Sequence, residues 1–521
     1  MTPFSAAANA AVDVNPALSA QRRPTGVAQS SSNSDWLSAS ARERSGGRFI
    51  SGPFQPARRR LRVRARPGRR CQAPERHVNR RAKNHPGDLS RTVARGFPLV
   101  DTAAMMQGIK TREVPLSRVL CVVGVLMGFV VAAGAPSAAS AQSARARVDG
   151  LVRDALAQHG VRAAIVQVKI AGRPVLKKAY GQSAAGVPAS TQMHFRNGTV
   201  ATAYMSTLLL RLADRGEVDL DDPLSKWVPG VRGASRVTLR MLAAMTAGYH
   251  DYATDPRTTA LRYANPFDQI ATQEQLRLAL ERPLQFTPGT NWSYSHSDYV
   301  LLGRALERIT KLPLSVALRR MVLRPLGLRH TRASSESPVP QPSLNAYSSE
   351  RRTFLGIPAG TPFIEDSTLW NPSWILARGA VQTTTIADLT RTAIAIGSGR
   401  LLSRRAHRLQ IAPHIDFGHP SPGCDRCTRL TRRYGYGLGV ARNGSWILQR
   451  SLFSGYGAIA SYLPSKKISI ALVTTFRASS HDAQGNLSSY WTRLHRKIAK
   501  VLAPRDAPVA GSSRALRQAD L

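Results

Sequence analysis

The sequence predicts one domain that mixes helices and strands, an α/β (α+β) fold, and three observations lead to this prediction. An amphipathic helix followed by a β-hairpin opens the domain, helical segments fill its middle, and β-rich runs with a last helix close it. Apolar residues at helical spacing indicate helices, whereas short apolar, β-branched runs indicate strands. We place this domain at residues 142–502.

The opening elements occupy residues 144–179. Apolar positions recur at helical spacing over residues 144–159, and two β-rich runs at 163–170 and 174–179 flank the turn Ala171-Gly172-Arg173. Leucine-rich residues 200–215 then predict a second helix, because its apolar positions repeat with the helical period. The chain therefore opens as helix, hairpin, helix.

The closing elements begin at residue 434. Short β-rich runs occupy residues 434–440, 445–449, 457–463 and 468–475, and a helix is expected over 487–502. Residues 503–521 lack either periodicity, so we expect them to form a loose tail.

The first 141 residues carry no part of the predicted domain. Residues 1–104 are an Arg-, Ser- and Pro-rich basic leader, which we interpret as disordered or as a mis-assigned start. Residues 105–141 resemble a signal peptide: Lys110 and Arg112 precede an apolar run at 119–133, and Ala139-Ser140-Ala141 offers a cleavage site. We therefore expect export across the cytoplasmic membrane, with an uncleaved membrane anchor as the alternative.

The charge of the chain is strongly positive. Lys and Arg number 73 against 31 Asp and Glu, a formal net charge of +42. Such an excess favours an anionic partner, which for an exported domain is a membrane or cell-wall surface. Nucleic acid is disfavoured, because no helix-turn-helix, zinc-finger or aromatic-basic motif accompanies the charge. A solvated basic surface without a partner is the other interpretation.

The segment Phe195-Arg196-Asn197-Gly198-Thr199-Val200-Ala201-Thr202 resembles the nucleophile motif of the serine β-lactamase and penicillin-binding-protein superfamily. The resemblance is to the branch of class C β-lactamases, DD-peptidases and related esterases, which has F-R-x-G-S-x-x-K here. Serine and lysine three residues apart lie on one helix face, so the amine can take the hydroxyl proton. In this chain those positions hold Thr199 and Thr202.

The resemblance extends over about residues 147–502 and implies two further motifs. Tyr294-Ser295-His296 stands at the family's Y-x-N, so Tyr294 and His296 join Thr199 and Thr202 as degenerate catalytic positions. The substrate-side strand motif, K-T-G or H-x-G, falls on Gln449-Arg450-Ser451 when counted without gaps, and on residues 453–455 in a shifted register. The implied fold is β-lactamase/transpeptidase-like, with an antiparallel sheet flanked by helices and an inserted helical subdomain.

The changed motifs predict a protein that is catalytically silent or severely impaired. Thr202 cannot act as a base at neutral pH, and the loss of a triad-like partner costs several decades of rate. The family acts on D-Ala-D-Ala peptides, β-lactams or small esters, so a wall peptide or small ligand is the partner that the resemblance implies. The alternative is a weak hydrolase that uses Thr199 with Tyr294 or with His296 as base.

Three polar features allow more than one interpretation. We favour His296 as a hydrogen-bonded pocket histidine, and Asp251 as a cap for local backbone amides rather than half of a triad. Cys424 and Cys427, with His414 and His419 nearby, have ligand types suited to zinc, but a local disulfide or a pair of thiols is the preferred interpretation. We expect no metal and no cofactor.

Overall fold

The computed structural model describes residues 138–333, 338–413, 415, 424 and 426–509. The chain divides into two compact units, Met1–Arg112 and Glu113–Leu521, and every described residue belongs to the second. The basic leader, most of the signal-peptide segment, and His414 and His419 lie outside the described residues.

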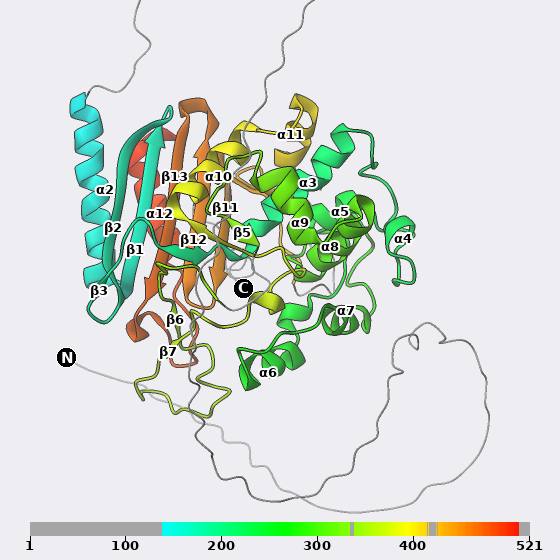
Figure 1. Ribbon diagram of the computed structural model, residues 1–521, viewed down its shortest axis with the longest axis horizontal. Coiled ribbons are helices and arrows are strands. Elements are labelled where there is room, and N and C mark those ends of the chain that lie inside the picture. The colour runs from blue at the N-terminus through cyan, green and yellow to red at the C-terminus, as the bar shows by residue number, and fades with distance from the viewer. Residues whose placement is uncertain (1–137, 334–337, 414, 416–423, 425, 510–521) are drawn as a thin grey trace, which may run out of the picture. The chain divides into compact units, whose positions relative to one another are not determined.

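The centre of the domain is an eight-stranded sheet with the order β3-β2-β1-β13-β12-β11-β10-β9, in which all neighbours are antiparallel (Figure 1). This arrangement confirms the predicted fold class. The strands are β1 (Val161–Ile170), β2 (Arg173–Ala184), β3 (Val187–Pro188), β9 (Tyr434–Tyr436), β10 (Ala441–Asn443), β11 (Trp446–Phe453), β12 (Tyr456–Leu463) and β13 (Ile468–Phe476).

The first hairpin forms where the sequence predicts it. Ile170 pairs with Arg173, and the two residues between them, Ala171 and Gly172, have φ of 47° and 81°. Two positive φ angles characterise the type I′ turn, whose twist matches that of the flanking strands. β1 also pairs with β13, so the first and last long strands of the chain lie side by side in the middle of the sheet.

Helices cover both faces of the sheet. α2 (Ala138–Gln158) and α12 (Tyr490–Leu502) contact each other and one face, whereas α10 (Ile386–Ser398) packs across β1, β12 and β13 on the other (Figure 1). α2 begins six residues before the expected helix start at 144, so Ala139-Ser140-Ala141 lies in its first turn. Its buried residues Val148, Val152 and Ala155 belong to the main apolar core.

A helical part stands between the opening and closing strands, as the resemblance implied. It adjoins the sheet through the turn Gly198–Val200, which leads into α3 and contacts the interior strand β11 (Figure 1). Its helices are α3 (Ala201–Asp214), α4 (Leu224–Trp227), α5 (Leu239–Ala244), α6 (Pro256–Ala264), α7 (Thr272–Leu280), α8 (His296–Thr310), α9 (Leu314–Leu318) and α11 (Arg404–Ile411). Two small sheets, β4-β8-β5 and β6-β7, accompany them, with β4 (His194–Arg196), β5 (Arg332–Ala333), β6 (Tyr347–Ser348), β7 (Glu365–Asp366) and β8 (Gln382–Thr385).

Two predicted elements differ from the structure. The strand expected over 434–440 stops at Tyr436, because the next residues bond to the helical part: Leu438 N donates to Gln410 O at 2.9 Å and Gly439 N to Ala243 O at 3.0 Å. The loose tail expected from 503 begins instead with an ordered turn, Pro504–Asp506. Trp446 Nε1 donates to Asp506 O at 2.7 Å, which holds this turn against β11.

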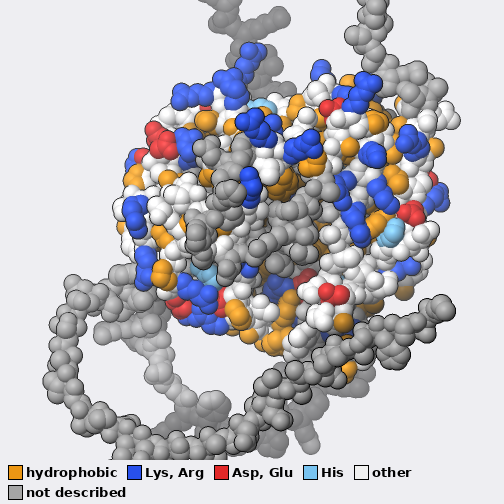
Figure 2. Space-filling view, turned by 180° about the vertical axis from the view of Figure 1, so that it is seen from behind, with side chains coloured by type: hydrophobic (Ala, Val, Ile, Leu, Met, Phe, Trp, Pro, Cys, Tyr) orange, Lys and Arg blue, Asp and Glu red, His pale blue; other side chains and the backbone are white. Residues whose placement is uncertain are grey.

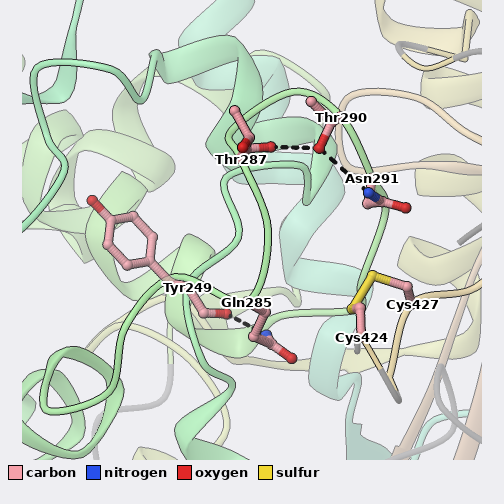
Figure 3. Close-up of a disulfide and its surroundings, with 7 residues drawn as sticks. All are labelled: Tyr249, Gln285, Thr287, Thr290, Asn291, Cys424 and Cys427. Atoms are coloured by element: carbon pink, nitrogen blue, oxygen red, sulfur yellow. Dashed lines mark hydrogen bonds between the residues drawn. A yellow bond between two sulfur atoms is a disulfide. The ribbon is translucent and has the colours of Figure 1, made fainter. Parts of the chain in front are cut away.

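The two cysteines of the domain form a disulfide, Cys424–Cys427 (Figure 3). Both are buried with Phe286, and Thr428 N donates to Trp292 O at 3.0 Å, so the disulfide loop lies against the segment that leads to Tyr294. The described residues contain no group of His, Cys, Asp and Glu able to hold a metal ion. Within the same residues, no helix combines the length and apolar character needed to cross a membrane.

Candidate active site

Thr199 lies in a sharp turn between β4 and α3, and Thr202 lies in the first turn of α3. The turn is a short 3-10 helix, Gly198–Val200, and Gly198 has a φ of 50°. A Cβ at Gly198 would lie 1.9 Å from Ser451 Oγ, so only glycine allows β11 to approach this closely. Thr199 is 4% exposed and Thr202 is fully buried.

The structure places Gln449, Arg450 and Ser451 beside Thr199. Ser451 Oγ accepts from Thr199 N at 2.9 Å, and Arg450 O accepts from Thr199 Oγ1 at 3.1 Å. The shifted register, residues 453–455, instead ends β11 and forms its turn, where Ser454 has a φ of 37°. Both registers reach the turn before α3: Ser451 bonds to Thr199, and Phe453 Cβ lies 3.1 Å from the position that a Cβ at Gly198 would take.

Arg450 offers Thr199 only its carbonyl group. Side chains alternate along a strand, and those of Gln449 and Ser451 both contact the Thr199–Thr202 segment, so the guanidinium of Arg450 points to the opposite face. There it donates to Tyr434 OH at 3.3 Å. On that face, burial lowers the pKa of His495 to about 3, and the charge of Arg450 adds to the effect.

Thr202, the residue predicted to replace the family's lysine, takes part in a neutral hydrogen-bond network. Thr202 Oγ1 donates to Thr199 O at 2.9 Å and accepts from Gln449 Nε2 at 2.9 Å. Gln449 Nε2 also donates to Gly439 O. Burial raises the pKa of Tyr436 to about 12, opposed by its hydrogen bonds with Thr202 and Gln449, so its phenol is neutral as well.

Tyr294 lies next to Thr199 but is held in its protonated form. It is 7% exposed, and burial raises the pKa of its phenol above the ordinary value, with a further contribution from Tyr436. A hydrogen bond with Thr199 acts in the opposite direction and does not offset burial. A phenol that keeps its proton can donate a hydrogen bond, but it is a poor base.

His296 and Asp251 form a buried pair on the other side of Tyr294. His296 Nδ1 lies 3.1 Å from Asp251 Oδ2, and Asp251 Oδ1 accepts from the backbone N of His296 and of Ala253 at 3.2 Å each. The predicted role of Asp251 as a cap is thus present, but the same carboxylate also binds the imidazole. Burial alone would raise the pKa of Asp251; the charge and hydrogen bond of His296 outweigh it, and the pKa is lowered.

Aromatic rings enclose this histidine. The ring centroid of Tyr294 lies 5.2 Å from that of His296, edge to face, and those of Tyr252 and Trp374 lie at 6.3 and 6.4 Å. His296 Nε2 has no hydrogen-bond partner among the described residues. Within this part of the chain, the hydrogen bonds of Thr199 do not include His296, so the structure does not join the imidazole to the hydroxyl.

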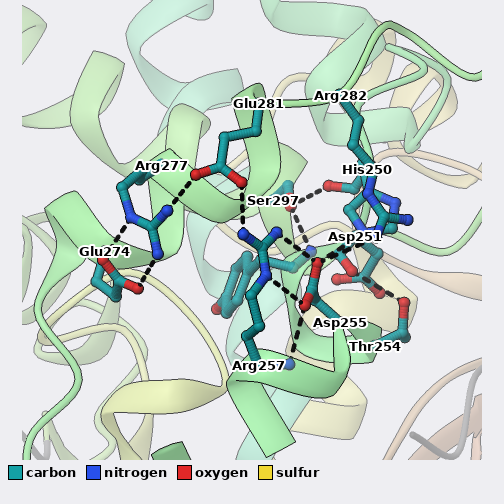
Figure 4. Close-up of polar contacts among 11 residues, drawn as sticks. His250, Asp251, Thr254, Asp255, Arg257, Glu274, Arg277, Glu281, Arg282 and Ser297 are labelled. Carbon is teal, nitrogen blue, oxygen red and sulfur yellow. Dashed lines mark hydrogen bonds and ion pairs between the residues drawn. The ribbon is translucent and has the colours of Figure 1, made fainter. Parts of the chain in front are cut away.

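A polar network fixes the turn that carries Asp251 (Figure 4). Asp255, which is 1% exposed, pairs with Arg257 Nη2 at 2.9 Å, and Ser297 Oγ links His250 O at 2.6 Å to Tyr252 N at 3.1 Å. Hydrogen bonds from Arg257 lower the pKa of Asp255 to about 2 against the opposing effect of burial. The Asp251–His296 pair is therefore held in place by its surroundings.

The model of the beta-lactamase family matches residues 148–489, about two thirds of the chain. The chain belongs to the beta-lactamase family. Among curated proteins it is similar to "Esterase EstB" of Burkholderia gladioli, 31% identical over 202 residues, which are 36% of this chain and 51% of that protein. It is also similar to a "Putative D-alanyl-D-alanine carboxypeptidase" of Salmonella typhimurium, 26% identical over 30% of this chain and 40% of that protein. The chain thus spans about half the length, or less, of these relatives.

Solved structures of this fold cover more of the domain. A D-stereospecific amidohydrolase from Streptomyces sp. aligns with a TM-score of 0.55 and 25% identity over 70% of this chain and 98% of its own. A D-amino acid amidase from Ochrobactrum anthropi SV3 has a TM-score of 0.56 and 21% identity over 69% and 99%. A penicillin-binding protein homologue from Pyrococcus abyssi has a TM-score of 0.56 and 17% identity over 70% and 79%, and these last two show the fold alone.

Sequence reasoning missed two parts of this site. Tyr436 and Gly439 were assigned to a continuous strand, so their contacts with Gln449 near Thr202 were not predicted. The closely spaced glycines 435, 437 and 439 were the available signal of a bend. The Asp251–His296 pair was also missed, although both residues were singled out. They are 45 residues apart, and no local pattern links them.

Proposed function

We propose that this member of the beta-lactamase family is an exported ligand-binding protein whose acyl-transfer activity is absent or severely reduced. The observation that carries the proposal is the network around Thr202, where Gln449 and Gly439 O occupy the hydrogen bonds that an amine would make. A threonine hydroxyl needs a base to become a nucleophile, and this network supplies none.

The proton of Thr199 has a different acceptor. Its hydroxyl donates to Arg450 O, and a carbonyl oxygen cannot carry the proton away. Tyr294 is protonated, and burial keeps it so. Loss of a triad-like partner costs about 10³–10⁶ in rate in enzymes of this logic, which supports a silent or severely slowed centre.

The backbone amide beside the hydroxyl is also engaged. Developing negative charge on a substrate carbonyl is stabilised by N–H groups about 2.7–3.1 Å away. Thr199 N, the amide closest in sequence to the hydroxyl, already donates to Ser451 Oγ at 2.9 Å. A substrate oxygen would have to displace Ser451, so this donor is not preorganised for catalysis.

The proposed ligand is a carbonyl compound of the kinds named for the relatives, a cell-wall peptide, β-lactam or small ester. The names esterase, carboxypeptidase and amidase support this choice. Side chains of Gln449 and Ser451 on β11, with Tyr294 on the loop before α8, are the groups we propose to contact it. Binding at this site needs Ser451 to exchange its hydrogen bond for one with the ligand.

The second candidate is a slow hydrolase that uses Thr199. Its supporting observation is the hydrogen bond between Thr199 and Tyr294, which places one possible proton acceptor beside the hydroxyl. His296 supports it less, because its recorded bonds go to Asp251.

Covalent labelling separates the two candidates. We expect the wild-type chain to give no labelled-penicillin adduct and no burst with a chromogenic ester, whereas a D-Ala-D-Ala peptide binds saturably to wild type and to Thr199→Ala. A burst that disappears in Thr199→Ala but persists in the matched hydroxyl deletion Thr207→Ala, on the helix α3 that follows the Thr199 turn, would establish the slow hydrolase instead.

Restoring the motif tests the network directly. Thr199→Ser with Thr202→Lys should stay inactive, because Gln449 and Gly439 O occupy the space and hydrogen bonds that the amine needs. Adding Gln449→Ala should give measurable ester hydrolysis by opening that space. Full activity in the double variant would show that the network does not block the amine.

Export rests on two features. The segment 105–141 has a basic start, an apolar run and a small-residue cleavage site. The Cys424–Cys427 disulfide is of a kind that persists in oxidising compartments outside the cytoplasm. Mass spectrometry of the protein from cells should find an N-terminus at Gln142, and a chain that starts before residue 105 in the cytoplasmic fraction would contradict export.

A further inference from the structure

Exposed arginines gather around α11, at an edge of the domain that the candidate site does not use. Arg400 follows α10, three arginines lie on α11, and two precede β9. We call this set the α11 arginine patch; its members are Arg400, Arg404, Arg405, Arg408, Arg432 and Arg433, all exposed. Seen from behind, Lys and Arg side chains gather along the upper edge of the molecule, where Figure 1 places α11 (Figure 2).

The fold brings these residues together. Arg404 and Arg405 lie four and three residues before Arg408, so the three share one side of α11, while Ala406 and Gln410 are buried on the other. A Cβ at Gly399 would meet the His407 ring at 2.4 Å, which sets Arg400 beside the helix. At the other end, a Cβ at Gly435 would lie 3.1 Å from Pro413 Cγ, which brings the start of β9 close.

Within the described residues, no ion pair neutralises the patch. The arginines of α6 and α7 differ: Arg257 pairs with Asp255 at 2.9 Å and with Glu281 at 2.6 Å, and Arg277 with Glu274 at 2.6 Å. The carboxylate next to α11, that of Asp214, accepts from Ser403 N and Oγ at 2.8 and 2.7 Å. Concentrated unpaired charge repels itself and attracts an external anion.

We propose that the α11 arginine patch docks this protein onto a membrane surface rich in anionic phospholipid. Guanidinium groups bind phosphate in bidentate fashion, and a juxtamembrane positive charge strengthens binding by about fivefold per residue. α11 lies at the surface with its three arginines exposed, whereas Leu402 before it and Leu409 near its end are half-buried against the core, so the charged groups would make the contact with a lipid headgroup layer. Single-stranded nucleic acid is disfavoured, because the described residues of α11 include no Phe, Tyr or Trp for base stacking.

This inference does not depend on the proposed ligand site. The patch lies on α11 and the residues just before β9, whereas Thr199, Tyr294 and His296 lie on the turn before α3, the loop before α8 and α8 itself. Docking at α11 and binding at Thr199 can each fail without the other.

Vesicle co-sedimentation of the full chain tests the proposal. We expect binding to vesicles that contain phosphatidylglycerol, little binding to pure phosphatidylcholine, and a decline as salt rises. The variant Arg404→Gln/Arg405→Gln/Arg408→Gln should bind about a hundredfold more weakly, by the fivefold factor for each charge. The matched control is Arg147→Gln/Arg173→Gln/Lys177→Gln, which removes the same charge from exposed positions on α2 and β2. It should bind within about threefold of wild type.

A second measurement is needed to locate the surface that contacts the vesicle, because the basic leader is present in wild type and in both triple variants. Hydrogen exchange with anionic vesicles should slow at the amides of α11 and not at those of α2. Equal losses in the two triple variants, or unchanged exchange at α11, would overturn the proposal. So would capture of α11 by single-stranded DNA that prevents vesicle binding at equal phosphate concentration.

Discussion

The two sides of Tyr294 differ in charge. On one side, Thr199, Thr202 and Gln449 form a neutral network in which each hydroxyl or amide is already bonded. On the other side, His296 and Asp251 form a buried pair of ionisable groups, and His296 Nε2 has no partner in the described residues. Uncharged hydroxyl and amide groups therefore surround Thr199 and Thr202, while a pair of ionisable side chains lies near Tyr294.

The difference separates two uses of buried polar groups. A neutral network whose groups are all hydrogen-bonded stabilises the close approach of β11 to the turn before α3. Its polar groups need no hydrogen bonds from water. A buried ionisable pair is stable only with both members present, so it responds to mutation and to pH. His296, the ionisable group near Tyr294, bonds to Asp251, and the hydrogen bonds of Thr199 within the described residues do not include it.

The largest loss of unfolding free energy should come from removing one member of the Asp251–His296 pair. Asp251→Ala leaves His296 buried without its partner and removes the cap on Ala253 N, so we expect a loss of about 3–5 kcal/mol in unfolding free energy. Asp251→Asn retains the cap and should lose less. Urea denaturation at pH 7 measures both, and a loss under about 1 kcal/mol in Asp251→Ala would show that the pair contributes little.

The next effect tests the closeness of β11 to the turn. Gly198→Ala places a methyl group 1.9 Å from Ser451 Oγ at a positive φ, so we expect a loss of at least about 2 kcal/mol and separation of β11 from Thr199. The matched control is Gly186→Ala, which has a φ of 72° and no heavy atom within 4 Å. Equal losses in the two variants would mean that backbone strain, and not contact with Ser451, explains the first.

A smaller effect is expected within the neutral side. Thr202→Val removes the acceptor of Gln449 Nε2 and should cost about 1–3 kcal/mol. Gln449→Met removes the donor, and the double variant should cost less than the sum, with a coupling of about 1 kcal/mol. Thermal or urea unfolding of the four proteins measures the cycle, and strict additivity would show that the two side chains act independently.

The smallest effect distinguishes the two sides by pH. The pKa of Asp255, which lies four residues after Asp251, is about 2, below its ordinary value of 3.8. Its stabilisation is thus complete above about pH 4 and is lost as the pH falls from about 4 to about 2, by about 1–2 kcal/mol after allowing for the exposure of Arg257. The wild-type advantage over Asp255→Asn should shrink over that range, whereas the advantage over Thr202→Val should not change.

The sequence by itself determined the fold class, the first hairpin and the resemblance to the family. These follow from local patterns: a 3.6-residue period, a two-residue turn at Ala171-Gly172 and a motif within eight consecutive residues. It also predicted by counting that Gln449–Ser451 form the substrate-side strand motif, and the structure places Gln449 and Ser451 against Thr202 and Thr199.

Only the tertiary structure decided what surrounds Thr199. Asp251 reaches His296 across 45 residues, and Gln449 reaches Thr202 across 247, so neither contact leaves a trace in local sequence. Gly439 lies outside the predicted strand because its backbone N–H donates to Ala243 O on α5 and not to a neighbouring strand. Long-range hydrogen bonds bring these polar groups together. They place neutral groups around Thr199 and Thr202 and the ionisable Asp251 and His296 near Tyr294.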